Sequence, residues 1–529
     1  MAVEVLDCTL RDGGYINNWE FGKAAITAIL DKLEAGSIDI IECGFLTSRP
    51  RDQDCTLFAS PRDIAPLLPR RQRNSLFVAM IAMGERELPP DKLPPKVPGG
   101  LEGIRLTFHR EETGLAMEWA AAIMDKGYQV FLQPVGTAFY SDLELLRLVE
   151  RVNLLKPYAF YIVDTLGSMY RNQVTRQFHL IDENMDPAVR LGFHGHNNLQ
   201  LAFSNAQVLS TIQTKRTLIL DSSVYGMGRG AGNLPTELIT RYINRNIQSR
   251  YNVAMVLDIY DSYIAPLRKE FEWGYTMAYQ LAATQSCHPN YAAYLMNKQT
   301  LTMTDIESIL RSIPRRQRVE FHRDLIRELY HRYQSKHIDD TKAVGELSAL
   351  IQNRELLVLA PGPSLRTRRG AVQEFLRERS PFVMTVNFTD PTFPVDACFF
   401  SNHKRLDIAG GKLQCQPGPR RIFTSNLAAY GDGDCLYVDY DRCANGDQMV
   451  SDNAGLMLLK LLERCGAKRV FLAGFDGAPG GYYDRSPAMA VSQAEALERQ
   501  RRMGEQLRKL PLELVFLTPS AYEEKEGVR

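Results

Sequence analysis

The sequence lacks the features that mark secreted, membrane-spanning or nucleic-acid-binding proteins. Its nine cysteines include no Cys-x-x-Cys pair, which argues against a structural zinc site or a disulfide framework and fits a reducing cytoplasm. No apolar run approaches the ~20 residues that span a bilayer, and a strand expected from residue 3 leaves no room for a signal peptide. The 63 basic and 62 acidic side chains nearly cancel, so no global field favours nucleic acid. We therefore expect a cytoplasmic protein with no membrane span and no nucleic-acid partner.

The first half of the chain alternates short apolar runs with amphipathic stretches such as Gly22–Ala35. Eight runs with strand composition, separated by helical stretches, predict a (β/α)₈ TIM barrel over residues 1–248. A doubly wound sheet is the alternative, but polar residues cluster just after several of the runs, which favours the barrel. The expected strands are Glu4–Cys8, Ile38–Leu46, Leu76–Ala82, Gly103–Phe108, Tyr128–Pro134, Ala159–Asp164, Arg190–His194 and Thr217–Ser222.

Two further regions follow the predicted barrel. Residues 249–345 are expected to form a helical extension that completes the active site, with helices over Asp305–Ile313 and Val319–Tyr333. Residues 354–529 predict a second α/β domain, Rossmann-like, with an open and mostly parallel sheet and helices such as Ala454–Cys465. Its expected strands are Leu356–Ala360, Phe382–Val386, Ala397–Phe400, Arg421–Thr424, Arg469–Ala473 and Leu512–Leu517.

Two distant segments supply the ligands of a metal site. His194 and His196 stand two apart at the end of an expected strand, so both side chains project from one face. Asp12 follows the first expected strand and adds a carboxylate. Two nitrogens and one oxygen, with open positions for water and substrate, suit a divalent Lewis acid, although two satisfied polar histidines are the alternative. We expect Mn²⁺ or Mg²⁺, with Zn²⁺ or Co²⁺ as alternatives.

Arg11 places a permanent positive charge beside Asp12. A guanidinium next to a metal could bind a carboxylate or stabilise an enolate oxygen. The alternative is a structural salt bridge to Glu42 or Asp7. Glu42 ends the second expected strand, and we expect it to orient Arg11 rather than to react.

Glycines follow both of these charged segments. Gly13 and Gly14 are expected to let a substrate approach the backbone closely. After the eighth expected strand, residues 226–233 form a glycine-rich run, which is either a flexible crossing or a lid or rim of the site. Asn233, at its end, could offer an amide oxygen near the metal.

These motifs together resemble the metal-dependent pyruvate aldolase and acyl-CoA lyase superfamily, which includes 4-hydroxy-2-oxovalerate aldolase and hydroxymethylglutaryl-CoA lyase. The resemblance covers about residues 1–300. It implies a TIM barrel whose metal is bound by Asp12, His194 and His196, with Asn233 a ligand or a neighbour. It also implies that Arg11 stabilises the enolate formed when a carbon–carbon bond is cleaved. The matching runs are Asp7-x-Thr9-Leu10-Arg11-Asp12-Gly13, Gly192-x-His194-x-His196-Asn197 and Gly230-Ala231-Gly232-Asn233.

The aldolase branch of this superfamily suggests further site residues. Its hydroxyl after the sixth strand, which helps to hold the pyruvate carboxylate, corresponds to Thr165. Its Tyr-x-x-Phe-Leu motif matches residues 291–295 and nominates Tyr291, within a polar break at residues 287–291 that could reach the barrel mouth. Where the branch keeps a basic histidine, this chain has Tyr15. The base is therefore open among Tyr15, Tyr291 and a hydroxide on the metal, and we expect a different preferred aldehyde.

The run Pro361-Gly362-Pro363-Ser364 follows an expected strand and could present backbone N–H groups to a phosphate. It resembles bacterial sialyltransferase-like proteins of surface-glycan gene sets, over about residues 355–480. The later runs that share this resemblance are Val386-Asn387, Asp452-Asn453-Ala454-Gly455 and Ala473-Gly474-Phe475-Asp476-Gly477. The resemblance implies a cytidine nucleotide sugar, with His403 as a base, and a non-catalytic domain is the alternative. The nucleotide-binding residues that it nominates are Gly362, Ser364, Asn387 and Asp476.

We therefore expect a metal-dependent aldolase that cleaves or forms a 4-hydroxy-2-oxo acid through a pyruvate enolate. Its partners are a 2-oxo acid and an aldehyde, with a nucleotide or nucleotide sugar at the second domain, in a homo-oligomer serving surface-polysaccharide biosynthesis. One alternative is an acyl-CoA-dependent Claisen lyase or synthase. The resemblance disfavours it, because the acyl-CoA lyases carry a cysteine in the loop after strand eight and residues 225–233 contain none. Others are a CMP-sugar glycosyltransferase with an accessory barrel, and a scaffold, which an open metal site disfavours. The expected catalytic residues are Arg11, Tyr15, Glu42 and Tyr291.

Overall fold

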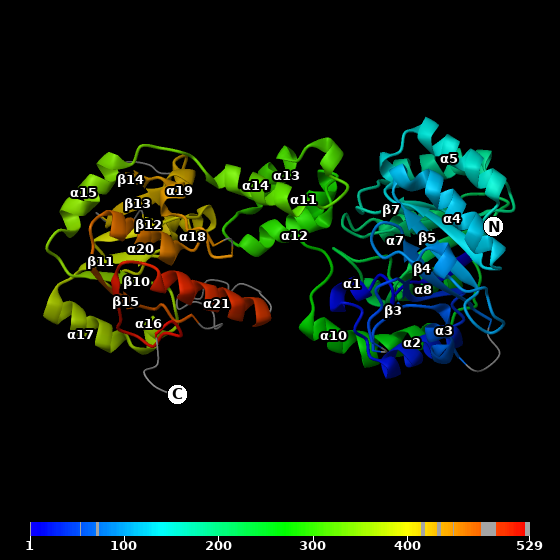
Figure 1. Ribbon diagram of the computed structural model, residues 1–529, viewed down its shortest axis with the longest axis horizontal. Coiled ribbons are helices and arrows are strands. Elements are labelled where there is room, and N and C mark those ends of the chain that lie inside the picture. The colour runs from blue at the N-terminus through cyan, green and yellow to red at the C-terminus, as the bar shows by residue number, and fades with distance from the viewer. Residues whose placement is uncertain are drawn as a thin grey trace. The chain divides into compact units, whose positions relative to one another are not determined.

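The chain forms two compact units (Figure 1). The computed structural model describes residues 2–52, 54–69, 74–413, 418–430, 435–447, 449–477 and 493–523. The first unit comprises Met1–Ala293 and Pro314–Phe321, and the second comprises Tyr294–Ile313 and His322–Arg529. The helical region expected over residues 249–345 is thus shared between the units, and its assignment as a separate domain stays a prediction.

Eight parallel strands close into a barrel in the first unit, as predicted. Their order is β1-β9-β8-β7-β6-β5-β4-β2, and β2 pairs with β1 to complete the circle. The two-residue strand β3 (Leu57–Phe58), which pairs with β2, was not predicted. The barrel strands are β1 (Val3–Asp7), β2 (Ile40–Leu46), β4 (Leu76–Ala82), β5 (Gly103–Phe108), β6 (Gln129–Pro134), β7 (Ala159–Asp164), β8 (Arg190–Gly195) and β9 (Leu218–Ser222).

Side chains along each barrel strand alternate between the lumen and the surrounding helices. In β2, Ile41 and Cys43 belong to the large core under the helices, whereas Ile40 belongs to a smaller cluster inside the barrel. Glu42 therefore points into the lumen, because successive side chains face opposite sides. By the same argument Arg105 points inward, since both of its neighbours in β5 lie in the outer core. The strand period thus places charged groups inside the barrel.

Helices cover the outside of the barrel (Figure 1). The predicted helix α2 buries Ile26, Ile29, Leu30 and Leu33, at the three- and four-residue spacing of one helix face. Each such fully buried side chain contributes about 2 kcal/mol to the free energy of unfolding. The helices of this unit before residue 277 are α1 (Gly14–Asn17), α2 (Lys23–Ala35), α3 (Pro61–Ile64), α4 (Thr113–Asp125), α5 (Asp142–Leu155), α6 (Arg171–Asn184), α7 (Ala202–Leu209), α8 (Thr236–Asn246), α9 (Val253–Ile259) and α10 (Ala265–Glu270).

The helical region that follows contains α11 (Met277–Thr284), α12 (Pro289–Lys298), α13 (Met303–Ser312) and α14 (Arg323–Gln334). The helix expected from Val319 is wrong at its start, because α14 begins only at Arg323. The preceding residues 314–321 pack with the first unit instead. Their carbonyl groups accept hydrogen bonds from residues 288 and 291, so they are not free to continue the ladder of a helix.

The second unit is built on an open sheet of seven strands, all parallel, as predicted. The order is β14-β13-β12-β11-β10-β15-β16, so the chain direction across the sheet reverses between β10 and β15. The edge strand β14 was not predicted, since it is short and only half buried. The Rossmann-like assignment stays a prediction. The strands are β10 (Leu356–Leu359), β11 (Phe382–Val386), β12 (Ala397–Phe400), β13 (Arg420–Thr424), β14 (Cys435–Val438), β15 (Arg469–Ala473) and β16 (Glu513–Phe516).

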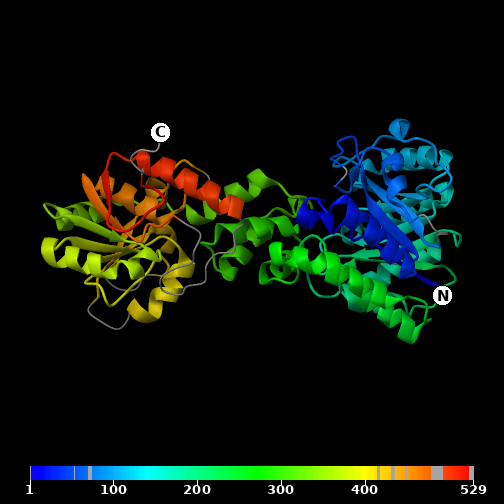
Figure 2. The same cartoon turned by 90° about the horizontal axis from the view of Figure 1, so that it is seen from below.

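Helices cover both faces of this sheet (Figure 2). In β10, Leu356 and Val358 pack in a core with α15 and α20, whereas Leu357 and Leu359 pack on the other face with α17. Among the described residues of the chain, no helix is long and apolar enough to cross a membrane. The helices of the sheet domain are α15 (Thr341–Ile351), α16 (Ser364–Thr367), α17 (Arg369–Arg379), α18 (His403–Leu413), α19 (Tyr440–Cys443), α20 (Ala454–Arg464) and α21 (Gln493–Arg508).

Candidate functional site

Asp12, His194 and His196 meet at the C-terminal mouth of the barrel. Each offers a ligand atom, and these atoms all lie within 4.8 Å of one another. Asp12 follows β1, His194 belongs to β8 and His196 follows it directly, so strand order brings together residues that are far apart in the sequence. The two imidazole rings have centroids 5.2 Å apart, and all three side chains are buried.

The Asp12 carboxylate is held ionised by its neighbours. Arg11 Nη1 donates to Asp12 Oδ1 at 2.5 Å, and Asn233 Nδ2 donates to Oδ2 at 2.5 Å. Burial raises the pKa of this carboxyl, but Arg11, both histidines and Asn233 outweigh that effect and bring the pKa well below its usual range. The group is therefore a carboxylate at any working pH.

Arg11 is fixed on two sides and keeps one donor for a ligand. Its Nε donates to Glu42 Oε2 at 2.9 Å. This contact agrees with both expectations from the sequence, that Glu42 orients Arg11 and that the two form a structural salt bridge. The indole of Trp19 donates to the Arg11 carbonyl at 2.8 Å. Arg11 Nη2 is buried and has no hydrogen-bond partner among the described residues, so an anionic oxygen in the site would satisfy it.

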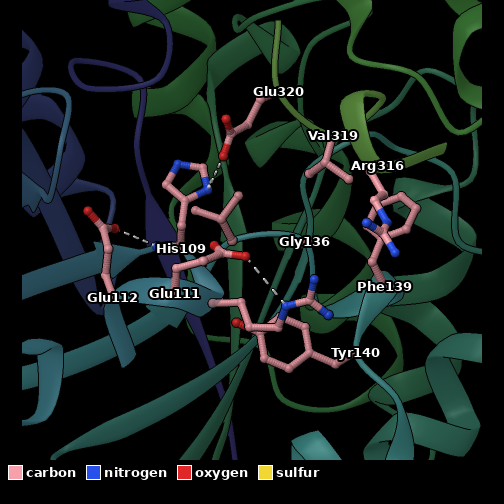
Figure 3. A pocket seen from close by; sticks show the side chains of 11 residues that line it. His109, Glu111, Glu112, Gly136, Phe139, Tyr140, Arg316, Val319 and Glu320 are labelled. Atoms are coloured by element: carbon pink, nitrogen blue, oxygen red, sulfur yellow. Dashed lines mark hydrogen bonds and ion pairs between the residues drawn. The ribbon is translucent and has the colours of Figure 1, made fainter. Parts of the chain in front are cut away.

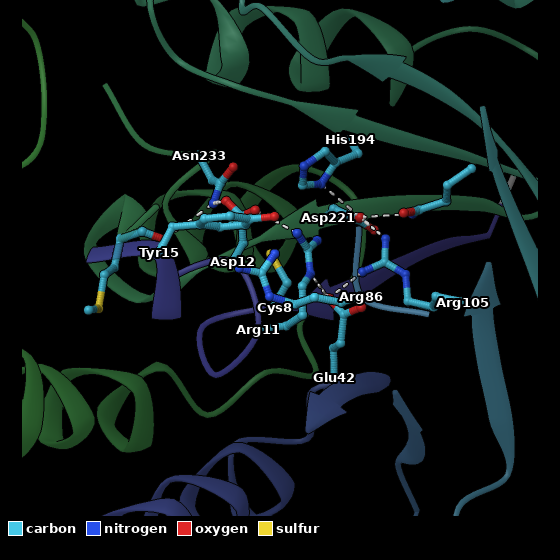
Figure 4. Close-up of polar contacts among 12 residues, drawn as sticks. Cys8, Arg11, Asp12, Tyr15, Glu42, Arg86, Arg105, His194, Asp221 and Asn233 are labelled. Atoms are coloured by element: carbon cyan, nitrogen blue, oxygen red, sulfur yellow. Dashed lines mark hydrogen bonds and ion pairs between the residues drawn. The ribbon is translucent and has the colours of Figure 1, made fainter. Parts of the chain in front are cut away.

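A chain of ionic contacts crosses the lumen below the mouth, from Arg11 through Glu42, Arg105 and Asp221 to His194 (Figure 4). Arg105 is fully buried and donates to both Glu42 and Asp221. Sequence analysis missed Arg105 and Asp221. The usable signal was a single arginine within an apolar strand, because a buried guanidinium requires carboxylate partners.

Asp221 determines which nitrogen of His194 faces the site. Its Oδ2 lies 3.0 Å from His194 Nδ1, which leaves Nε2 as the ligand nitrogen. Burial raises the pKa of Asp221, but Arg105 and His194 outweigh it and the pKa falls below its ordinary value. Burial lowers the pKa of His196 to about 3, so this imidazole is neutral and able to bind a cation.

The donor set fits a divalent metal ion. His196 Nδ1 and Asn233 Oδ1 are buried and have no hydrogen-bond partner in the described part of the chain. Three carboxylates and two guanidinium groups lie in or below the site, which leaves one negative charge for a cation to balance. These charged residues are Asp12, Glu42, Asp221, Arg11 and Arg105.

The glycine-rich loop of residues 226–233 packs directly on the site. A Cβ atom on Gly228 would lie 2.3 Å from Asn233 Nδ2 and 2.6 Å from Asp12 Oδ2. Gly232 has a φ of +83°, and a Cβ there would meet the Gly226 carbonyl oxygen at 2.0 Å. Of the two predicted roles, the geometry favours a rim that covers the ligands over a flexible crossing.

The predicted role of Gly13 and Gly14 in substrate approach is wrong. A Cβ on Gly14 would lie 2.1 Å from the Trp19 indole, and one on Gly13 would lie 2.3 Å from the Thr9 carbonyl oxygen. The space beside these glycines is therefore filled by the protein itself. Their lack of a side chain lets Trp19 pack beneath the Arg11 segment.

Tyr15 lies near the rim formed by the glycine-rich loop. Its hydroxyl is 3.4 Å from Glu85 Oε1, and its ring packs edge-on against Trp19 with centroids 4.8 Å apart. The guanidinium groups of Arg86 and Arg229 each lie 5.4 Å from the ring centroid. Because Arg229 belongs to the loop that covers Asp12, these contacts place Tyr15 at the edge of the site.

Thr165 follows β7 and contacts Gly136, which lines a cavity at the barrel mouth. Its Oγ1 accepts from the Gly136 N–H at 2.9 Å, so its own proton can donate to a second partner. Gly136 lines a cavity of about 520 Å³ beyond the C-terminal ends of β5 and β6 (Figure 3). His109 and Glu320 pair across it at 3.4 Å, and the other lining side chains include Arg110, Phe139, Tyr140 and Arg316.

Tyr291 is fully buried, and its hydroxyl contacts the backbone. It lies 2.8 Å from the Gln317 carbonyl oxygen and 2.9 Å from that of Glu320, and its ring packs against Phe321. These contacts tie α12 to the segment 314–321. The nearby His288, which sequence analysis included only within a polar break, has a pKa well below its ordinary value because of burial and the proximity of Arg229 and His196.

Three of the predicted nucleotide-binding residues meet in the second unit, at the ends of β10 and β15. Ser364 N–H donates to Asp476 Oδ2 at 2.7 Å, and a Cβ on Gly362 would lie 2.6 Å from Asp476 Oδ1. The Asp476 carboxylate thus accepts the hydrogen bond of the N–H group that we expected to bind a phosphate. Asn387 follows β11, where its Oδ1 accepts from Ser401 N at 3.0 Å. His403 stacks on Tyr430, with ring centroids 3.7 Å apart.

Comparison with known proteins supports the superfamily that the motifs indicate. The HMGL-like family model matches residues 110–262, which include His194, His196 and Asn233. A 4-hydroxy-2-oxovalerate aldolase of Geobacillus thermodenitrificans is 29% identical over 173 residues, which cover 32% of this chain and 48% of that enzyme. The chain thus spans about half the length of this relative. The 4-hydroxy-2-oxovalerate aldolase 2 of Salinispora arenicola is 25% identical over 269 residues, covering 50% of this chain and 74% of that enzyme.

Among solved structures, the HMG-CoA lyase of Brucella melitensis is 15% identical and has a TM-score of 0.40. It covers 51% of this chain and 99% of that lyase. The first unit is thus similar to the HMGL-like family and to 4-hydroxy-2-oxovalerate aldolases.

Proposed function

We propose that the first unit is a divalent-metal-dependent aldolase that cleaves or forms a 4-hydroxy-2-oxo acid through a pyruvate enolate. The observation that carries the proposal is the buried cluster in which Asp12, His194 and His196 lie within 4.8 Å while Arg11 donates to Asp12. A cation site next to a fixed guanidinium is suited to hold an enolate oxygen. The aldolase relatives support this substrate class over an acyl-CoA.

Different residues of the site bind the metal, the enolate oxygen and the carboxylate of the substrate. A divalent ion held by Asp12, His194 and His196, with Mn²⁺ or Mg²⁺ as first choices, would polarise the 2-oxo acid as a Lewis acid. Arg11 directs its remaining N–H group to the enolate oxygen as negative charge develops there. Thr165 donates a hydrogen bond from its hydroxyl group to the substrate carboxylate.

The base removes the proton of the 4-hydroxyl group, the electrons of the C3–C4 bond pass to C3, and the aldehyde leaves. Tyr15 is the candidate base, because it lies at the edge of the site, where Arg229 of the glycine-rich loop covers its ring. Tyr291 is less suited, since its hydroxyl already contacts two backbone carbonyls. Tyr291 instead helps to position the segment that borders the site.

Pyruvate release from 4-hydroxy-2-oxo acids, measured with added Mn²⁺ or Mg²⁺, tests the proposal. Asp12→Asn should lower the rate about 100-fold or more and weaken Mn²⁺ binding in equilibrium dialysis, because it removes the anionic ligand. Asp258→Asn, which alters an exposed carboxylate on α9, is the matched control and should change neither. Full activity of Asp12→Asn would show that the metal assignment is wrong.

Arg11→Lys tests the enolate assignment separately from metal binding. Lysine keeps the charge but cannot bridge Glu42 and Asp12 while also facing the substrate. We expect aldol cleavage and the decarboxylation of oxaloacetate, which forms the same pyruvate enolate, to fall together by about 10²–10³. Mn²⁺ affinity should change little. Release of free CoA from an acyl-CoA substrate would instead favour the Claisen alternative.

We propose that the second unit binds a nucleotide or nucleotide sugar, which would connect the enzyme to surface-polysaccharide biosynthesis. The reversal of strand order between β10 and β15 supports this, because open parallel sheets bind ligands at such a point. An incoming phosphate would have to displace the Asp476 carboxylate from Ser364. Calorimetric titration with CMP tests the proposal: heat that Asn387→Ala abolishes supports it, and no heat from the unaltered chain contradicts it.

A further inference from the structure

His288 is a buried imidazole near the predicted metal ligands, and the mechanism above does not use it. Its side chain is 7% exposed, and its pKa is lowered by burial and by the proximity of Arg229 of the glycine-rich loop and of His196. It precedes α12 and belongs to the first unit. It therefore reaches the barrel mouth from outside the eight strands.

The segment that carries His288 is held on two sides. Its backbone N–H donates to the Arg318 carbonyl oxygen at 2.7 Å, and Tyr291 anchors the next turn to the same segment. On the other side, a Cβ on Gly230 would lie 3.4 Å from Pro289 Cβ, so the glycine-rich loop packs closely against it. The imidazole is thus fixed between this loop and residues 314–321.

The hydrogen bond to Nδ1 determines the tautomer of His288. The Asn290 N–H donates to Nδ1 at 3.1 Å, so Nδ1 carries no proton. In the neutral ring the proton is then on Nε2, and the neutral form is favoured because the ring is buried near the positive charge of Arg229. Nε2 can therefore only donate a hydrogen bond. A neutral imidazole that donates to an oxygen gaining charge is an efficient electrophilic catalyst.

We propose that His288 is a further catalytic residue whose Nε2–H donates to the C4 oxygen of the 4-hydroxy-2-oxo acid. This inference rests on the proposed aldolase function. The enolate oxygen is served by Arg11, so C4 is where a second donor is needed. Pro289, next to His288, packs against Gly230, and the adjacent Arg229 lies over the ring of Tyr15, which indicates that donor and candidate base face the same end of the substrate.

The step balances without any proton transfer by His288. The 4-hydroxyl proton passes to the base, the C3–C4 electron pair becomes the enolate, and the C4–O bond becomes the aldehyde carbonyl. His288 keeps its proton and stabilises the negative charge that accumulates on the C4 oxygen before the bond breaks. In the direction of synthesis, the same contact polarises the aldehyde.

Two substitutions distinguish a hydrogen-bond donor at position 288 from a general base and from a residue that only supports the structure. The amide nitrogen of His288→Gln reaches the Nε2 position and can donate, whereas that of His288→Asn cannot. At saturating 4-hydroxy-2-oxovalerate, we expect His288→Asn to cleave the substrate about 10²–10³ times more slowly, and His288→Gln to recover the rate to within about tenfold of the unaltered chain. His179→Gln, an exposed histidine on α6, is the matched control.

Oxaloacetate decarboxylation provides the second measurement, because it forms the enolate without a C4 hydroxyl group. His288→Asn should lose much less of this reaction than of aldol cleavage, and Mn²⁺ affinity should stay within about threefold. Equal losses in the Gln and Asn variants, or equal losses in the two reactions, would overturn the assignment. If the unaltered chain releases no pyruvate from either substrate, the proposed function fails and this assignment fails with it.

Discussion

Asp221 touches no predicted substrate position, yet it controls the orientation of a metal ligand. Its carboxylate is shared between His194 and Arg105, both within the barrel lumen. Carboxylates that hold a ligating histidine fix the ring and raise the basicity of its other nitrogen. Substitutions of Asp221 should therefore affect the affinity for the metal more directly than the rate of the chemical step.

We predict that Asp221→Asn weakens Mn²⁺ binding by about 10- to 100-fold, because the amide loses the negative charge that pairs with Arg105 and raises the basicity of His194. Equilibrium dialysis of the two proteins against Mn²⁺ measures the difference. Tryptophan emission should confirm that the barrel still folds, and Asp258→Asn again serves as the control. Unchanged affinity in a folded Asp221→Asn protein would contradict the role of Asp221.

Asp7 predicts a pH dependence of barrel stability. It is the buried last residue of β1, and its carboxylate accepts hydrogen bonds from Thr236 Oγ1 at 2.7 Å and from the Thr9 N–H at 2.9 Å. Burial raises its pKa from 3.8 to about 6, against the effect of these hydrogen bonds. Between these values the folded chain binds more protons than the unfolded chain, so this contribution to stability is present at low pH and is lost as the pH rises through about 6.

Above that pH the buried charge costs roughly 3 kcal/mol at most. Asp7→Asn keeps the shape and removes the charge, so the variant should exceed the unaltered protein in free energy of unfolding by about 1–3 kcal/mol at pH 7.5. Near pH 4 the difference should almost vanish. Urea titrations followed by tryptophan emission provide the measurement, and an Asp7→Asn protein that is less stable at both pH values would refute the argument.

The residues that sequence analysis found and those that it missed differ in how far their partners lie along the chain. Asp12, His194 and His196 stand in local motifs at strand ends, so the chemistry of each motif is visible by itself. The link from Arg105 to Asp221 depends on the register of nonadjacent barrel strands, which no local pattern specifies. The glycine at position 14 suggested close approach of a substrate, but the indole of Trp19, five residues further along the chain, fills that space.

At the scale of elements, the barrel strands were predictable because each is a nearly continuous buried run. The helix α14 was predicted four residues too early, since residues 319–321 have helical composition, but the Glu320 carbonyl accepts from Tyr291 and the preceding Arg318 carbonyl accepts from the His288 N–H. The edge strand β14 escaped because half of its side chains are partly exposed. The local sequence pattern therefore failed in two situations, where tertiary hydrogen bonds prevented a helix and where a strand lies at the edge of the sheet.

The glycine-rich loop allows a test at this scale. We predict that Gly228→Ala reduces Mn²⁺ affinity and aldol activity by about tenfold or more, because its Cβ would collide with Asn233 Nδ2 and Asp12 Oδ2. The control is Gly114→Ala in α4, where a Cβ would meet nothing within 4 Å. That change should preserve activity and stabilise the helix by about 0.5–1 kcal/mol. Normal Mn²⁺ binding by Gly228→Ala would show that the loop does not constrain the ligands.

At the scale of the whole molecule, the chain contains separate hydrophobic cores. The largest core of the first unit extends from Val3 to Trp273, and that of the second begins at Ala343. The sequence predicted two α/β regions but not the division of the helices between them, because amphipathic helices in this stretch carry no mark of which surface they will cover. Contacts, not composition, assign α13 and α14 to the second unit.

The three tryptophans of the chain, Trp19, Trp119 and Trp273, all belong to the first unit, so their emission monitors that unit alone. We predict that Gly362→Ala destabilises the second unit by about 1–3 kcal/mol, since a Cβ there would lie 2.2 Å from the Gly474 carbonyl oxygen. In urea, the variant should lose part of its far-ultraviolet circular dichroism earlier, while the tryptophan transition stays where it is.

Gly370→Ala in α17 is the matched control, because a Cβ there would meet nothing within 4 Å and the change should not lower either transition. Independent transitions follow if each of the two large cores, which have no described residue in common, gains its stability from its own burial. If Gly362→Ala shifts the tryptophan transition together with the dichroism, the two units unfold as one. The helical segments 294–313 and 322–334 would then couple the barrel to the sheet rather than belong to one of them.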